Sequence, residues 1–175
     1  MISELQFIHF LTATLLIDLF FLFAFKIVNR KGKKWISINN WYNNLKWTAV
    51  ILDVLSIMIG FYISKFIYDY LLKNNYITIK NEFIIFILIV LIVQIIHDFG
   101  FYFLVIKQVP YGKNRVIDEF KSYANIVGIN AVIGDSLMYI FATPILYFII
   151  QNTSNNVNIF TSLVSLYLIG YLIHQ

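Results

Sequence analysis

Four aspartates and one histidine stand inside long apolar runs, where an ionisable side chain is costly. Asp18, Asp53 and Asp135 fall in three separate runs, and the adjacent pair His97 and Asp98 falls in a fourth. Placing such a side chain at the centre of a bilayer costs about 2.5–3.5 kcal/mol on insertion scales, so these residues are expected to face protein or water. Carboxyl and imidazole groups exchange protons and bind cations. The pattern therefore indicates proton or ion handling as the first candidate chemistry.

Three of these acids share a helix face with small or polar residues, because positions three and four apart lie on one side of a helix. The three sets are Asp53, Ser56, Gly60 and Ser64; Gln94, His97, Asp98 and Phe101; and Asn125, Gly128, Val132, Asp135 and Tyr139. At 1.5 Å per residue, Asp53 lies roughly 9 Å, and Asp98 and Asp135 roughly 12 Å, from corresponding ends of their helices. We therefore expect one polar centre formed by Asp53, Gln94, His97, Asp98 and Asp135, with Asp18 nearer the midplane.

The same stripes also permit a purely structural role. Ser56, Gly60 and Ser64 form a ladder of small residues that lets a neighbouring helix approach closely. Polar side chains between membrane helices often only join the helices, each hydrogen bond contributing roughly 0.6–2 kcal/mol. A protonated aspartic acid bonded to His97 or Gln94 would be satisfied without any further function. Both interpretations stay open.

Known catalytic motifs are missing from the sequence. The chain has no cysteine, which excludes thiolate nucleophiles and Cys-ligated metals. Val132 stands where the Gly-x-Gly-Asp motif of intramembrane aspartyl proteases needs glycine, and Gly134-Asp135-Ser136 lacks the serine-hydrolase elbow. Three carboxylates and a histidine could hold a divalent cation, but no His-Glu-x-x-His motif is present, so a metal is left open. No catalytic residue and no cofactor are predicted, and an enzyme is the third choice.

The elements that must position these residues are membrane helices. Sixty per cent of the 175 residues are hydrophobic and only 13% are charged, well outside the range of soluble domains. The apolar runs cover residues 5–28, 47–72, 83–106, 127–150 and 157–173. Each is long enough to cross a hydrocarbon core of about 30 Å. The sequence predicts a single all-α membrane domain over residues 1–175.

One connection is expected to contain a further helix. Pro110 to Asn114 has the composition of a turn, and Asn114 is a suitable helix N-cap. Val116, Ile117, Phe120 and Tyr123 can lie on a membrane surface. An interfacial helix is therefore predicted over residues 115–124.

Basic residues in the connections give the orientation. The first connection contains Arg30, Lys31, Lys33, Lys34 and Lys46, and the third contains Lys107, Lys113, Arg115 and Lys121. The other two connections contain only Lys73 and Lys80. The positive-inside rule then places both basic connections and the C-terminus in the cytosol, and the N-terminus outside. The sequon Asn152-Thr153-Ser154 falls in an outer connection, close to the membrane.

The first basic connection is expected to contact lipid. Trp35, Trp41 and Trp47 lie in it or beside it, as in an interfacial aromatic belt. Arg30, Lys31, Lys33 and Lys34 precede or flank these tryptophans. With membrane on both sides, anionic lipid is the expected partner here and at the other basic connection, and nucleic acid is not.

Several segments resemble a viral protein family. These are Gln94 to Tyr102 (QIIHDFGFY), Pro110 to Asn114 (PYGKN), Phe120 to Ala124 (FKSYA) and Gly134 to Ser136 (GDS). Over roughly Asp53 to Ser136 the chain is similar to uncharacterised multi-span membrane proteins of large nucleocytoplasmic DNA viruses. The resemblance implies a virion internal membrane or a host membrane of the infected cell, and virion proteins as partners. It implies no activity.

Two functions remain as the main hypotheses. The first is proton or cation handling at the polar centre, by a homo-oligomer, because five helices barely enclose a path. The second is a structural or scaffolding membrane protein whose basic connections dock partners.

Overall fold

The structure of the chain is a computed structural model that describes residues 1–27 and 32–174. Arg30 and Lys31 therefore lie outside the described residues, as do the side chains of Lys33 and Lys34.

Among the described residues, five helices are long and apolar enough to cross a membrane. They are α1 (Phe7–Ile27), α3 (Trp47–Lys73), α4 (Glu82–Phe101), α6 (Ile129–Asn152) and α7 (Asn155–Ile173). The single turns η1 (Ile2–Glu4) and η2 (Ile79–Asn81) precede α1 and α4, and the π-helical turn η3 (Tyr102–Ile106) extends α4. The described residues contain no strand. The predicted all-α fold is confirmed, and the chain is a multi-pass membrane protein by the length and composition of these helices.

Two shorter amphipathic helices complete the fold. The predicted interfacial helix is present as α5 (Arg115–Val127). The connection between the first two spans was expected only as a basic loop, and it forms a further helix, α2 (Lys33–Leu45). Trp41, Tyr42 and Leu45 are buried, whereas Asn40 and Asn43 on its other face are exposed. The helix forms because its apolar face is covered by its neighbours, which outweighs the weak helix propensity of its asparagines.

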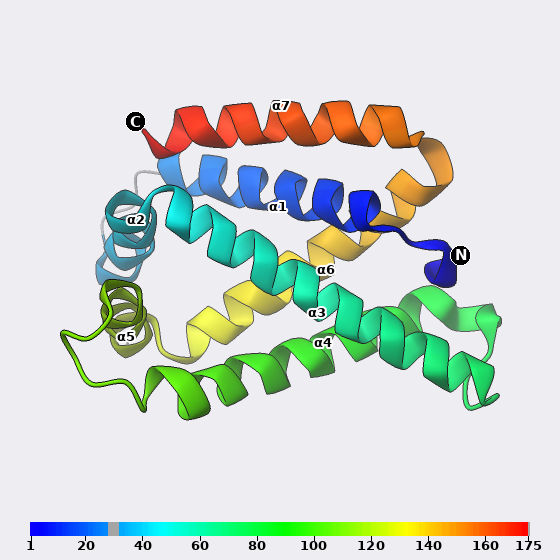
Figure 1. Cartoon of the computed structure of the whole chain (residues 1–175), viewed down its shortest axis with the longest axis horizontal. Helices are drawn as coiled ribbons and strands as arrows, with labels where there is room; N and C mark the ends of the chain where they lie inside the picture. The colour runs from blue at the N-terminus through cyan, green and yellow to red at the C-terminus, as the bar shows by residue number, and fades with distance from the viewer. Residues whose placement is uncertain (28–31, 175) are drawn as a thin grey trace.

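The two short helices lie together across one end of the bundle (Figure 1). Four spans pack in a ring, with α1 on both α6 and α3 and α4 on both α3 and α6, and α7 packs on α1. The C-terminus lies at the end occupied by α2 and α5, and the N-terminus lies at the opposite end. Lys46 at the α2–α3 junction donates a hydrogen bond to the carbonyl of Ile173, at 2.9 Å. Both basic connections and the C-terminus therefore share one end, while its cytosolic location stays a prediction.

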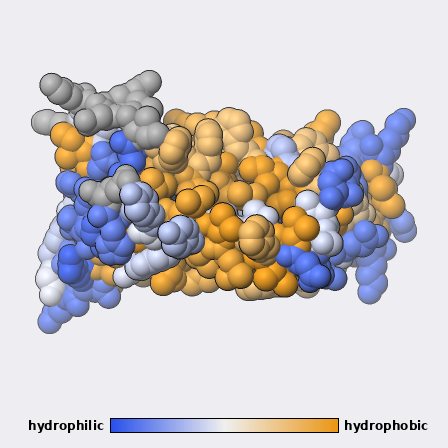
Figure 2. Space-filling view, turned by 90° about the horizontal axis from the view of Figure 1, so that it is seen from above, coloured by the Kyte–Doolittle hydropathy of each residue, from blue (hydrophilic) through white to orange (hydrophobic). Residues whose placement is uncertain are grey.

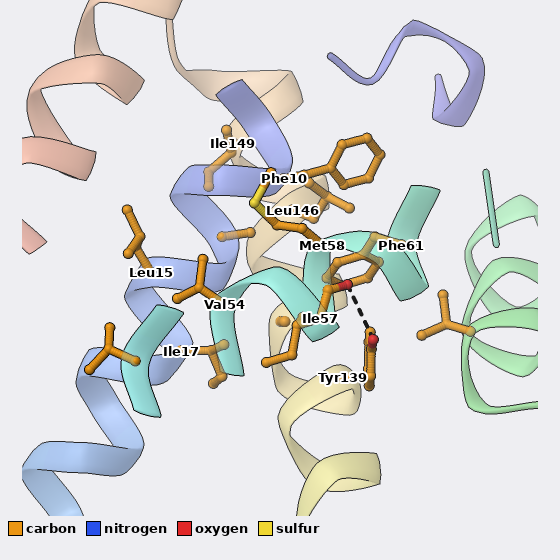
Figure 3. Packing of buried hydrophobic residues seen from close by; sticks show 14 of the residues in the cluster. Phe10, Leu15, Ile17, Val54, Ile57, Met58, Phe61, Tyr139, Leu146 and Ile149 are labelled. Carbon is orange, nitrogen blue, oxygen red and sulfur yellow. Dashed lines mark hydrogen bonds between the residues drawn. The ribbon is translucent and has the colours of Figure 1, made fainter. Parts of the chain in front are cut away.

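The core is formed by aromatic and aliphatic side chains from α1, α3 and α6 (Figure 3). Phe61 stacks on Phe10 with ring centroids 5.8 Å apart, and Tyr139 meets Phe61 edge-on at 5.1 Å. The Tyr139 hydroxyl donates to the carbonyl of Ile57 at 3.2 Å. An added Cβ on Gly60 would lie only 1.9 Å from the Tyr139 hydroxyl oxygen. Gly60 is therefore required by the close approach of an aromatic side chain.

This packing changes the interpretation of the small-residue ladder. Ser56 offers its carbonyl to the Tyr139 hydroxyl at 3.3 Å, and Ser64 is buried and donates to the carbonyl of Gly60 within its own helix at 2.7 Å. The ladder was expected to let two helix backbones approach each other. It instead makes room for the Tyr139 ring, because α6 presents a bulky residue at this level.

A hydrophobic band covers the middle of the face seen in Figure 2, and hydrophilic residues gather toward its two ends. Large apolar side chains on the outer faces are strongly exposed, among them Phe66, Leu104, Phe160 and Tyr167. Soluble monomers rarely expose so much contiguous apolar surface, whereas a lipid-facing surface requires it. The surface thus matches the apolar core and polar boundaries of a bilayer.

Candidate functional site

Asp53 is held by two aromatic donors from α2. The Tyr42 hydroxyl donates to Asp53 Oδ2 at 2.9 Å, and the indole N–H of Trp41 lies 3.3 Å from the same oxygen. The Tyr42 oxygen also lies 3.4 Å from Asp18 Oδ1 on α1. A phenol has one hydrogen to donate, so Tyr42 can donate a strong hydrogen bond to only one of these carboxyl groups at a time.

Tyr42 stays a donor because of its surroundings. Burial raises the pKa of the Tyr42 phenol well above its ordinary value, and the carboxyl groups of Asp53 and Asp18 raise it further. The neutral, hydrogen-bearing form is therefore favoured at this position.

Asp18 is fully buried on α1. Its Oδ2 atom has no hydrogen-bond partner among the described residues, and neither does the hydroxyl of Thr14, one turn earlier. An ionised carboxylate in such a place would carry a large desolvation cost, so Asp18 favours a bound proton.

A second group of polar side chains joins α4 to α6. The Gln94 amide donates to Asp98, and its oxygen accepts a hydrogen bond from the Ser136 hydroxyl at 2.8 Å. Asp135, next to Ser136 on α6, lies near the Asp98 carboxyl group. His97 Nδ1 lies 3.4 Å from Asp98 Oδ1.

His97 lies at the edge of this group. Its ring stacks on Phe101 with centroids 5.9 Å apart, and 36% of its side chain is exposed. The exposure places the imidazole on the outer side of α4, whereas Asp98 turns inward. His97 therefore connects the group to the surface of the bundle.

Tyr123 of α5 brings the two groups together. Burial raises the pKa of the Tyr123 phenol, and the neighbouring carboxyl groups of Asp135, Asp53 and Asp98 raise it further. Three helices, α3, α6 and α4, thus each bring an acid near this phenol. The Tyr123 ring also lies 6.3 Å from the ring of Trp41, whose indole N–H points to Asp53. We call Asp18, Asp53, Asp98 and Asp135 the aspartate centre, and it lies next to the helices that cross the end of the bundle.

Helix α5 is fixed in place at its start and along its side. The Asn114 side chain accepts hydrogen bonds from the backbone N–H groups of Val116 at 2.9 Å and Ile117 at 3.2 Å. This confirms the predicted N-cap. Asn44 of α2 bonds Glu119 at 2.9 Å, and its carbonyl accepts from Arg115 at 2.8 Å. These contacts set the depth at which Tyr123 enters the aspartate centre.

The three tryptophans differ in their surroundings. Trp41 is only 7% exposed and is covered by Phe120 of α5, at a centroid distance of 5.1 Å. It is therefore not the lipid-interface residue that was expected, because its indole is buried and its N–H points to the Asp53 carboxyl group. Trp47 is 38% exposed and lies over Gly170 of α7. Trp35 meets Phe25 of α1 at 5.6 Å.

Sequence reasoning missed four members of this site, namely Trp41, Tyr42, Tyr123 and Ser136. The signal for Tyr42 and Tyr123 was a polar aromatic on the apolar face of an amphipathic helix. That signal predicts a tyrosine at the membrane interface as readily as a tyrosine in a buried hydrogen bond. Within the described residues, no group of three or more His, Asp or Glu side chains is arranged to hold a metal ion.

No protein-family model, no curated protein and no solved structure matches the chain. The resemblance to viral membrane proteins therefore stays a prediction.

Proposed function

We propose that this membrane protein takes up and releases protons at the aspartate centre. The observation that carries the proposal is the position of the Tyr42 hydroxyl between two carboxyl groups, 2.9 Å from Asp53 and 3.4 Å from Asp18. A phenol has one hydrogen to donate, so the buried carboxyl group that does not receive it is best stabilised by a proton of its own. Such a pair gains and loses its protons in coupled steps.

The surrounding charges support a bound proton. In the part of the chain whose side chains are described, the ion pairs are Met1 with Glu82, Lys65 with Asp69, and the His97–Asp98 contact. None of them brings a lysine or arginine to the aspartate centre. Protons are then the simplest counter-charge for acids in a low-dielectric environment. A divalent cation is a weaker candidate, since no described set of ligands is arranged for one.

A path for the proton is also available. His97 Nδ1 lies 3.4 Å from Asp98 Oδ1, and the ring reaches the outer side of α4. An imidazole can accept a proton on one ring nitrogen and release one from the other. Five spans barely enclose a path by themselves, so we propose that the chain works as a homo-oligomer. The cytosolic placement of the basic end, and a viral or infected-cell membrane as the location, are part of the same proposal.

Purified protein in liposomes loaded with a pH-sensitive dye tests the proposal. We expect an imposed membrane potential to drive proton flux through the wild-type protein, and Asp98→Asn to abolish it while the protein stays folded. Asn is nearly isosteric and keeps a hydrogen-bonding side chain but cannot release a proton. Asp69→Asn is the matched control, because Asp69 pairs with Lys65 away from the centre. Wild-type liposomes with no flux above empty liposomes between about pH 5 and 8 would contradict the proposal.

A structural role is the second candidate. It is favoured by hydrogen bonds that join distant spans, such as Ser136 to Gln94 and Thr12 to Ser162 at 2.9 Å. If the aspartate centre only holds helices together, Asp98→Leu leaves buried partners unpaired and lowers the free energy of unfolding by about 1–3 kcal/mol. Asp98→Asn is then tolerated and no proton flux exists to lose. A scaffolding role for the basic end fits this second candidate.

A further inference from the structure

A pocket of about 190 Å³ opens between the end of α4 and α5, apart from the aspartate centre. Its lining comes from the π-helical turn η3, the following loop and α5, and consists of Tyr102, Ile106, Lys107, Tyr111, Lys121 and Asn125. Helix α5, which contributes Lys121 and Asn125 to the lining, crosses one end of the bundle (Figure 1).

The lining is cationic and rich in hydrogen-bond donors. Lys107 and Lys121 supply two ammonium groups, and no acidic residue is among the lining side chains. Lys121 donates to the carbonyl of Val109 and lies 4.8 Å above the Tyr111 ring. An ammonium carries three N–H donors, so this contact leaves donors for a ligand. The phenols of Tyr102 and Tyr111 add neutral donors.

The π-helical turn places Tyr102 and Lys107 on the same side. In an α-helix, residues five apart point about 140° away from each other. The backbone N–H of Lys107 instead bonds the carbonyl of Tyr102, at 2.8 Å, which closes the wider π turn. Both side chains then line the pocket.

The surroundings of the pocket are lipid-facing. Phe103 and Leu104 belong to the same turn, and Leu104 is 77% exposed. Apolar side chains that protrude from the end of a span lie against acyl chains, and the next turn then reaches the headgroup level. Lys107 follows one turn after Phe103, and its ammonium lies 5.7 Å from the Phe103 ring.

We propose that this pocket binds the phosphate-bearing headgroup of an anionic membrane lipid. The two lysines neutralise the phosphate, and the tyrosine and asparagine side chains donate hydrogen bonds to its oxygens. The acyl chains run along the exposed face of η3 and α4. Inorganic phosphate offers the same oxygens without the chains, so the apolar face beside the pocket is the reason to choose a lipid.

Native mass spectrometry of the protein released from nanodiscs tests this proposal. The nanodiscs contain phosphatidylcholine and phosphatidylglycerol in equal amounts. We expect the wild-type protein to retain phosphatidylglycerol, and each Lys→Gln change at Lys107 or Lys121 to lower that retention about five-fold. The double variant Lys107→Arg with Lys121→Arg keeps both charges, and we expect it to retain the lipid as the wild-type protein does. This result would show that the loss in the Lys→Gln variants comes from the missing charge and not from misfolding.

Two further arms complete the test. Lys73→Gln and Lys80→Gln, each made alone, remove the same single charge from the opposite end, and we expect each to leave retention unchanged. An equal loss in either control would show a general electrostatic attraction and would overturn the pocket. Inorganic phosphate is added in excess as a competitor, and we expect it not to displace the lipid. Displacement by inorganic phosphate would instead assign the pocket to a free anion.

Discussion

Tyr42 occupies a position where one hydrogen faces two carboxyl groups. Its oxygen lies 2.9 Å from Asp53 and 3.4 Å from Asp18, two side chains that belong to different spans. The shorter distance shows that Asp53 receives the hydrogen. Asp18 is then left with a weak contact on one oxygen and, within the described residues, none on the other. A proton arriving at Asp18 would turn this residue from a competitor for the Tyr42 hydrogen into a donor.

Removing that phenol should cost stability. We expect Tyr42→Phe to lower the free energy of unfolding by about 1–3 kcal/mol, since it leaves the two carboxyl groups without their shared donor and hardly changes the volume. Thermal unfolding in detergent, followed by tryptophan fluorescence, measures the change. Tyr70→Phe is the control, because Tyr70 is exposed on α3. Equal losses for the two variants would show that the Tyr42 hydroxyl has no special role.

Gly60 gives a prediction about packing. We expect Gly60→Ala to destabilise the bundle by about 1–3 kcal/mol, because the new methyl group collides with the Tyr139 hydroxyl. Gly134→Ala is the matched control, since a Cβ there meets nothing within 4 Å and alanine favours a helix. Denaturation midpoints in the same detergent compare the two variants. If Gly60→Ala were as stable as Gly134→Ala, the close approach of Tyr139 would be refuted.

The long helices could be predicted element by element, because each contains its own signal. Nothing beyond the length of an apolar run is needed to place α3, which was expected over 47–72 and is observed at Trp47–Lys73. Helix α2 contains no such signal. Its asparagines disfavour a helix, and the partners that stabilise it come from α3 and from α5, far along the chain. The same distance in sequence explains why Tyr42 and Tyr123 could not be assigned to the aspartates beforehand.

The N-cap of α5 can be tested as an element. We expect Asn114→Ala to weaken the helix by about 1 kcal/mol, because the N–H groups of Val116 and Ile117 lose their acceptor. Hydrogen exchange of the α5 backbone amides should accelerate accordingly. Asp is an equally good cap, so Asn114→Asp should preserve protection. Unchanged exchange in the alanine variant would show that α5 is held by its packing on α2 alone.

At the scale of the whole molecule, the gathering of α2, α5 and the C-terminus at one end gives an orientation that can be measured. The chain has no cysteine, so single-cysteine variants have no background. We expect Lys80→Cys to react with an impermeant maleimide in intact cells. Asn40→Cys and Lys113→Cys should react only after permeabilisation. The three positions are exposed. The reverse labelling pattern would invert the proposed topology.

The pairing of α1 with α7 has a consequence for how the protein is made. Thr12 on α1 bonds both the hydroxyl of Ser162 and the backbone carbonyl of Asn158 on α7. During synthesis α1 emerges more than a hundred residues before these partners, and its polar side chains then face the translocon or a lipid. The contact between α1 and α7 cannot form until α7 has been inserted. A ribosome that stalls before α7 therefore leaves Thr12 with only its hydrogen bond to the carbonyl of Ile8 in the same helix, at 2.8 Å.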